Sequence, residues 1–170
     1  VAVLAVWSVG HERPTVPEQR DIAHAVSDLR HAAGAVLAAA DGPGRATVLG
    51  ELQLLDGCRL TPVRDGVAGA RDVTVHVRQG EMRTAMERIR AALPGGYRTE
   101  LGESRGGTRL SFHSDAGAFI GVDGTAESTA QVLTLRLSTG CRPHSGHLDR
   151  ADPAAAPPPA LFQRALDTLG

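Results

Sequence analysis

The chain of 170 residues has no lysine and no asparagine, and its 18 basic residues are all arginine. This bias indicates a GC-rich genome, because the codons for arginine, alanine, glycine and proline are GC-rich. The sequence contains 18 basic and 19 acidic residues, so the net charge is −1. Nucleic acid and an anionic membrane surface both require a basic field, and neither is expected to be the main partner. The five aromatic residues are too few for a platform that stacks bases.

The sequence also has no apolar run of the roughly 20 residues that a membrane-spanning helix requires. Its first ten residues, VAVLAVWSVG, are apolar and uncharged. We interpret residues 1–10 as the end of a signal peptide or membrane anchor, with Ser8-Val9-Gly10 as a candidate cleavage triplet. The alternative is a short buried strand of a cytosolic domain.

Residues 11–44 predict a polar spacer and then an amphipathic helix over 16–40. Thr15 and Glu18 have the spacing of a capping box, and AAADGPG at 38–44 ends the helical pattern. Apolar residues recur at helical spacing and form one stripe. This stripe must pack on a sheet or on a second copy, and we assign its residues as an interaction surface: Ile22, Val26, Leu29 and Val36.

Residues 45–143 predict an α+β domain with a largely antiparallel sheet of about seven strands and both helices on one face, because short turns join most of the strands. Asp56-Gly57 and Arg64-Asp65-Gly66 are expected to be turns. Residues 144–170 are a Pro/Ala-rich tail with a short helix near its end. The strands are expected at 45–55, 58–63, 70–77, 97–101, 108–114, 117–123 and 131–138, and the second helix at 81–93.

Two cysteines are present, Cys58 and Cys141, each in a Gly-Cys-Arg tripeptide. The even number, the export-like N-terminus and their positions at strand ends favour a disulfide over two separate buried thiols. A zinc site is a further alternative, because Cys141, His144 and His147 follow a C-x2-H-x2-H spacing that Cys58 would complete. That spacing does not match the common paired-ligand signatures.

The stretch SFHSD places Ser111, His113 and Asp115 on one face of a strand. These are the residue types of a hydrolase triad, but neighbours two apart on a strand point in parallel and rarely orient one another. The alternative to catalysis is a solvated face of a half-buried strand.

The apolar N-terminus, the capped helix, CRLTPV, ALPGGY, STGCRP and the Pro/Ala tail together resemble small membrane-anchored or secreted actinobacterial proteins. The resemblance implies a location outside the cytoplasm and supplies no catalytic residue. We therefore expect a binding or assembly module without a cofactor, which is either anchored to the membrane through its N-terminal segment or secreted. Its expected partner is another protein or its own copy at the cell surface. The alternatives are a hydrolase or zinc enzyme at the two sites above, or a carrier with an apolar cavity.

Overall fold

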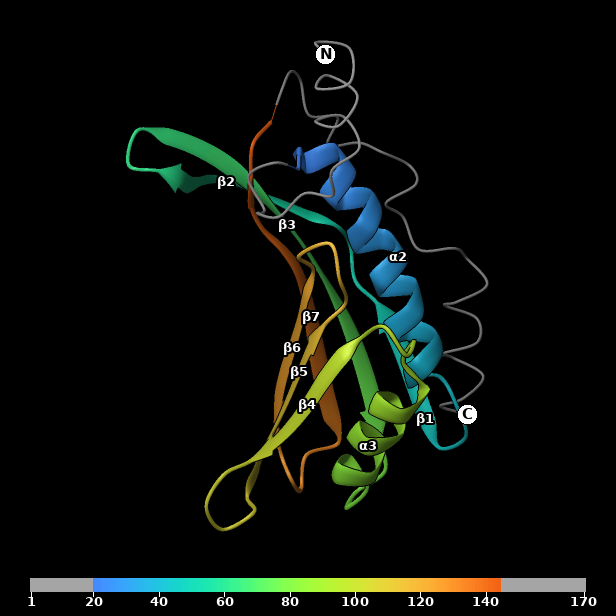
Figure 1. The fold of residues 1–170 in the computed structure, drawn as a ribbon. Coiled ribbons are helices and arrows are strands. Elements are labelled where there is room, and N and C mark those ends of the chain that lie inside the picture. Colours follow the sequence, from blue (N-terminus) through green and yellow to red (C-terminus); the bar gives the residue numbers. More distant parts are fainter. Residues whose placement is uncertain (1–19, 145–170) are drawn as a thin grey trace, which may run out of the picture.

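The computed structural model describes residues 20–144, which form two helices and seven strands (Figure 1). Every pair of neighbouring strands is antiparallel, and together they form one open sheet. The predicted α+β class is confirmed. In chain order the elements are α2 (Ile22–Ala40), β1 (Arg45–Leu49), β2 (Gln53–Thr61), β3 (Arg64–Val77), α3 (Met82–Ala92), β4 (Arg98–Glu103), β5 (Arg109–Asp115), β6 (Gly121–Glu127) and β7 (Val132–Arg142).

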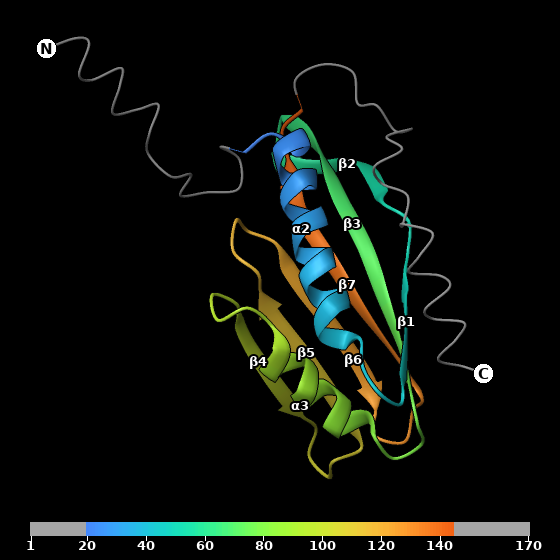
Figure 2. The ribbon, with the colours of Figure 1, turned by 90° about the vertical axis from the view of Figure 1, so that its right-hand side faces the viewer.

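The strand order is β1-β3-β7-β6-β5-β4, and β2 also pairs with β3. The first half of the long strand β3 pairs with β2 and its second half with β1. At the other edge, β4 pairs with β5 alone. Figure 2 shows α2 and α3 in front of the sheet, both on the same face. The opposite face, which we call the open face, is left without a helix among the described residues.

The core forms between the helices and the sheet because apolar residues alternate along the strands. In β7, Leu133, Leu135 and Leu137 are fully buried, while the residues between them are exposed or half-buried. Fully burying one such side chain stabilises the fold by about 1.5–3 kcal/mol. The helices complete the core with Leu29, Val36, Met82, Met86 and Ile89.

The first helix begins later than its sequence pattern predicts. Asp21 is its N-cap, and the carboxylate of Asp21 accepts a hydrogen bond from the amide of Ala23 at 2.8 Å. An aspartate at this position satisfies one of the unpaired amides of the first turn. The amide of Ile22 donates to the carbonyl of Pro143 at 2.9 Å, which ties the start of the helix to the end of β7. The predicted capping box at residues 15 and 18 lies outside the described residues, as do the predicted signal peptide or anchor at residues 1–10, the predicted spacer before residue 20 and most of the predicted tail.

The helix stripe packs on the sheet, which was one of its two predicted destinations. Ile22, Leu29 and Val36 are buried in the core, and Val26 is half-buried. The prediction that these four residues form an interaction surface is therefore wrong for the three buried ones, because the protein's own sheet already covers them.

Two predicted turns are wrong. The chain passes through Asp56 and Gly57 within β2, where Gly57 adopts a φ of +80° at a β-bulge. The turn consists of Pro62 and Val63, between the paired residues Thr61 and Arg64. The predicted turn at Arg64-Asp65-Gly66 is instead the start of β3. Asp-Gly pairs suit any position that needs a positive φ, in a bulge as well as in a turn, so the sequence signal does not separate the two.

The first predicted strand, 45–55, is divided into β1 and β2 near Gly50. The amide of Gly50 donates to the carbonyl of Asp72 at 2.8 Å, and the carbonyl of Gly50 accepts from Arg71 Nε at 2.8 Å. A Cβ at Gly50 would lie 3.2 Å from the Asp72 carbonyl oxygen. Glycine therefore allows this close approach to β3, and the chain leaves β1 here before it enters β2.

Candidate functional site

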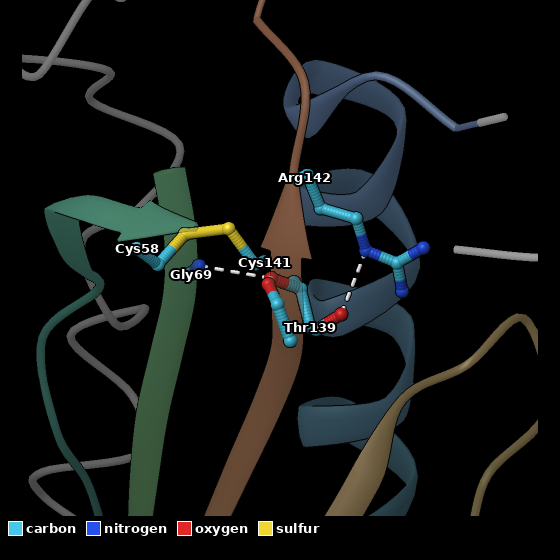
Figure 3. The surroundings of a disulfide bond; sticks show 6 residues. Cys58, Gly69, Thr139, Cys141 and Arg142 are labelled. Carbon is cyan, nitrogen blue, oxygen red and sulfur yellow. Dashed lines mark hydrogen bonds between the residues drawn. A yellow bond between two sulfur atoms is a disulfide. The ribbon is translucent and has the colours of Figure 1, made fainter. Parts of the chain in front are cut away.

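A disulfide joins Cys58 of β2 to Cys141 of β7, with the two Cα atoms 5.8 Å apart (Figure 3). Both strands pair with β3, so the bond links two strands that flank a third. Gly66 of β3 lies beside it, and a Cβ there would lie 2.8 Å from Cys141 Sγ. The predicted disulfide is present, and the position explains why residue 66 is a glycine.

The disulfide contradicts the alternative zinc site, because it occupies the two cysteine sulfurs that would bind the metal. Among residues 20–144, no group of three or more His, Cys, Asp or Glu residues is arranged to hold a metal ion. His147, the last of the predicted ligands, lies outside that range, and His144 is exposed at its end.

Arg142, next to the disulfide, is a fully buried cation. Its Nε donates to the Thr139 carbonyl at 2.7 Å, and its Nη2 donates to the Phe119 carbonyl at 3.1 Å. Its guanidinium also lies 5.5 Å from the centre of the Phe119 ring. Ala118 and Phe119 have φ angles of +50° and +62°, which are unusual for residues other than glycine. Arg142 thus holds the loop before β6, which explains why β6 starts at residue 121 rather than 117.

Ser111, His113 and Asp115 lie on the open face of β5, as the sequence predicts. As their parallel orientation predicts, the acid that contacts His113 is not Asp115. His113 Nδ1 lies 2.7 Å from the carboxylate of Asp123 on β6, directly opposite in the register. The sequence analysis missed Asp123, because only the pairing of β5 with β6 brings it to His113.

The acid of the predicted triad has other partners. Asp115 pairs with Arg98 on β4 and accepts a hydrogen bond from the amide of Gly117 at 2.8 Å. The Gly117 amide, followed by Arg98, lowers the pKa of Asp115. Asp115 therefore stays ionised in a structural role at the start of the loop, rather than orienting the histidine.

The hydrogen bond to Asp123 raises the pKa of His113 above its ordinary 6.5, and the charges of Asp123, Glu100 and Asp115 add to that effect. The side chains of His113 and Asp123 are 59% and 64% exposed. The pair keeps its proton to a higher pH than an isolated histidine, because the pKa of His113 is raised, but it stands on a solvated surface and not in an enclosed site.

The same row of the open face continues across the sheet with alternating charge. Asp123 faces Arg136 on β7, and Arg136 Nη1 lies 3.4 Å from the carboxylate of Asp72 on β3. The row joins acids and bases in turn, so the open face has no strong charge of one sign. In register order it contains Glu100, His113, Asp123, Arg136 and Asp72.

A hollow of about 130 Å³ lies on the helix side, between α3 and the edge strand β4. Its apolar wall is formed by Met86, Leu101 and Leu110. Charged side chains surround this wall, and Arg83 pairs with Glu103 across the hollow at 2.7 Å. The hollow has room for one aliphatic side chain.

No protein-family model and no curated protein matches this chain. Its fold is similar to that of a DUF4853 family protein from Actinomyces odontolyticus, an actinobacterium. The two chains are 14% identical, and the similarity covers 91% of this chain and 81% of the other, with a TM-score of 0.54. At this level of identity the likeness shows a shared fold and nothing about activity.

Within residues 20–144, no helix is long and apolar enough to cross a bilayer. Three features of the described residues could contact a ligand or a partner. These are the disulfide end with its hairpin, the open face with the His113–Asp123 pair, and the hollow beside β4.

Proposed function

We propose that the chain is an extracytoplasmic domain, anchored to the membrane or secreted, that acts as a binding or assembly module. The observation that carries the location is the Cys58–Cys141 disulfide, because such bonds persist in oxidising compartments and are rare in the cytosol. The apolar segment at residues 1–10 supports the same location.

For the binding role, the hollow between α3 and β4 is the best-placed surface. An edge strand exposes backbone donors and acceptors to which a partner's strand can pair. The edge opposite β4 is formed by β1 and β2, which both pair with β3. β2 has two register irregularities and β1 pairs over five residues, whereas β4 pairs with β5 in unbroken register over six residues. Bulges protect an edge against added strands, so β4 is the longest regular edge strand to which a partner can pair.

The partner that fits this surface is an extended segment of another protein or of a second copy of this chain. Its backbone would pair with β4, and one of its aliphatic side chains would fill the hollow and contact Met86, Leu101 and Leu110. The charged rim would select little by charge, because it contains two arginines and two glutamates: Arg83, Arg90, Glu87 and Glu103.

Location and binding can be tested separately. For location, cells that express the full chain are treated with a thiol-blocking reagent before lysis, and the intact mass is then measured. A mass two hydrogens below the reduced chain, with no blocked thiol, supports the oxidising compartment. Two blocked thiols would refute it.

For binding, a photoreactive amino acid is placed at Leu101 and, as a control, at the exposed Leu55 on the other side of the sheet. We expect crosslinked adducts of defined mass at position 101 alone. Sedimentation of the purified full chain then shows which of the two candidate partners binds. A chain that binds its own copy sediments as a dimer, and a chain that binds another protein sediments as a monomer. Equal adducts at both positions, or none at 101, would rule out this surface.

The hydrolase alternative has one supporting observation, the hydrogen bond between His113 and Asp123. In such an enzyme, Asp123 would orient the imidazole, and Ser111 on the same face would be the nucleophile. A fluorophosphonate probe should then label the native chain and fail to label Ser111→Ala and His113→Ala. Without labelling of the native chain, this alternative is discarded.

A further inference from the structure

The β2–β3 hairpin projects from the rest of the sheet, with its turn at Pro62 and Val63 (Figure 1). Val63 is 96% exposed, twice as much as the other large exposed apolar residues among those described. Those two residues are Leu55 at 47% and Val132 at 46%. The hairpin therefore presents its most exposed large apolar side chain at its turn.

The base of this hairpin is firmly attached. The Cys58–Cys141 disulfide fixes β2, and the amide of Gly69 on β3 donates to Thr139 Oγ1 on β7 at 2.9 Å in a buried hydrogen bond (Figure 3). Because both strands of the hairpin are held at the base, the direction in which the tip projects is set by the sheet.

The hairpin lies at the same end of the molecule as the start of α2 and the end of β7 (Figures 1 and 2). The hydrogen bond between the Ile22 amide and the Pro143 carbonyl keeps those two ends together. Residues 1–10 therefore connect to the domain at the hairpin end, through the nine residues 11–19. Fully extended, nine residues span at most about 30 Å.

We propose that the tip of the β2–β3 hairpin contacts the lipid surface and orients the domain on the membrane. This proposal rests on the proposed anchoring through residues 1–10. One valine is too small to hold a protein on a bilayer by itself. A tether makes the contact intramolecular, and a weak contact then suffices to select one orientation.

The charges near the tip agree with a lipid interface. Arg59 and Arg64 flank the turn, and Asp65 lies opposite Arg59, so the tip has one excess positive charge. Arginine side chains extend along an apolar surface and keep the guanidinium among the headgroups. A single excess charge favours anionic headgroups slightly. With the tip on the membrane, α3 lies at the far end of the domain (Figure 1). The hollow between α3 and β4 then stays open to a partner.

The first test measures depth in the membrane with tryptophan fluorescence. The full chain with Trp7→Phe receives Val63→Trp, or Val132→Trp as the matched control on another strand. Each is reconstituted with vesicles of phosphatidylcholine and phosphatidylglycerol that contain brominated acyl chains. We expect the emission of the Val63→Trp chain to be quenched and shifted to the blue, and that of the Val132→Trp chain to be unchanged.

Each other outcome overturns the proposal in a distinguishable way. If the protein sediments with the vesicles but the Val63→Trp chain is not quenched, anchoring stands and the hairpin contact is wrong. If both chains are quenched equally, the domain adsorbs without a preferred orientation. If neither protein sediments with vesicles, the anchoring and the hairpin contact fail together.

A second test uses the unmodified full chain and therefore avoids any affinity that a new tryptophan adds. Trypsin cleavage after Arg64 should slow severalfold when vesicles are present. Cleavage after Arg105, in the exposed loop between β4 and β5, should keep its rate. Slower cleavage at both sites, or at neither, would contradict contact through the hairpin. If a membrane-protein extract slows cleavage after Arg64 and vesicles do not, the tip contacts a protein and the lipid proposal is wrong.

Discussion

Removal of the disulfide should cost a large part of the stability of this domain. The change is the double variant Cys58→Ala and Cys141→Ala, which removes the bond without leaving a free thiol. The two cysteines are 83 residues apart. In the chain-entropy treatment, releasing a loop of this length lowers the free energy of unfolding by about 4–5 kcal/mol. Domains of this size are stable by about 5–15 kcal/mol, so the variant should be marginal at physiological temperature.

The measurement is equilibrium unfolding in urea, followed by circular dichroism. Native chain treated with a reductant serves as the control, since it should unfold at nearly the same midpoint as the double variant. The slope of the free energy with urea should rise in both, because the unfolded chain without the bond exposes more surface. A loss below about 1 kcal/mol, or a native chain that is insensitive to reductant, would refute the assignment of a stability role to this bond.

Three further predictions concern single residues. Arg142→Met leaves buried carbonyls without a donor, each costing about 1–3 kcal/mol, so urea unfolding should show a loss of about 3 kcal/mol or more that Arg142→Lys recovers only in part. Because the pKa of His113 is raised in the folded state, the stability that its proton supplies is present below about pH 6.5 and is lost as the pH rises through the folded pKa. Asp123→Asn should return the His113 pKa toward 6.5 in an NMR titration and flatten the pH dependence of stability in that window; an unchanged pKa would mean that Asp123 is not the partner. Asp21→Ala removes the N-cap of α2 and should lower the unfolding free energy by about 1 kcal/mol, whereas Asp21→Ser should preserve most of it and a neutral Asp21→Ala would disprove the cap.

Local patterns in the sequence were sufficient for much of the fold. The alternation of Leu133, Leu135 and Leu137 with other residues predicts a strand at 131–138, because side chains in a strand alternate between faces. The strand is present as β7, which continues to Arg142. The cysteines could be paired because two residues allow one intramolecular bond. Boundaries were harder to predict where one residue type serves several local conformations, as Gly57 does in its bulge.

The candidate sites depend on register, which the sequence does not display. Asp123 meets His113 because β5 and β6 pair with those two residues opposite, and a shift by two residues would bring another side chain to the histidine. The hollow beside β4 likewise needs α3 to cross the edge of the sheet at Met86. Such long-range arrangements result from the packing of the whole domain.

The two cysteines also determine how the protein can mature. Cys58 belongs to an early hairpin, but its partner lies in β7, so the bond cannot form until nearly all of the described domain has been synthesised. Within one chain, no incorrect pairing is possible, because those are its only two thiols. Formation of the bond therefore needs an oxidant, and once formed the bond keeps β2 and β7 on the two sides of β3.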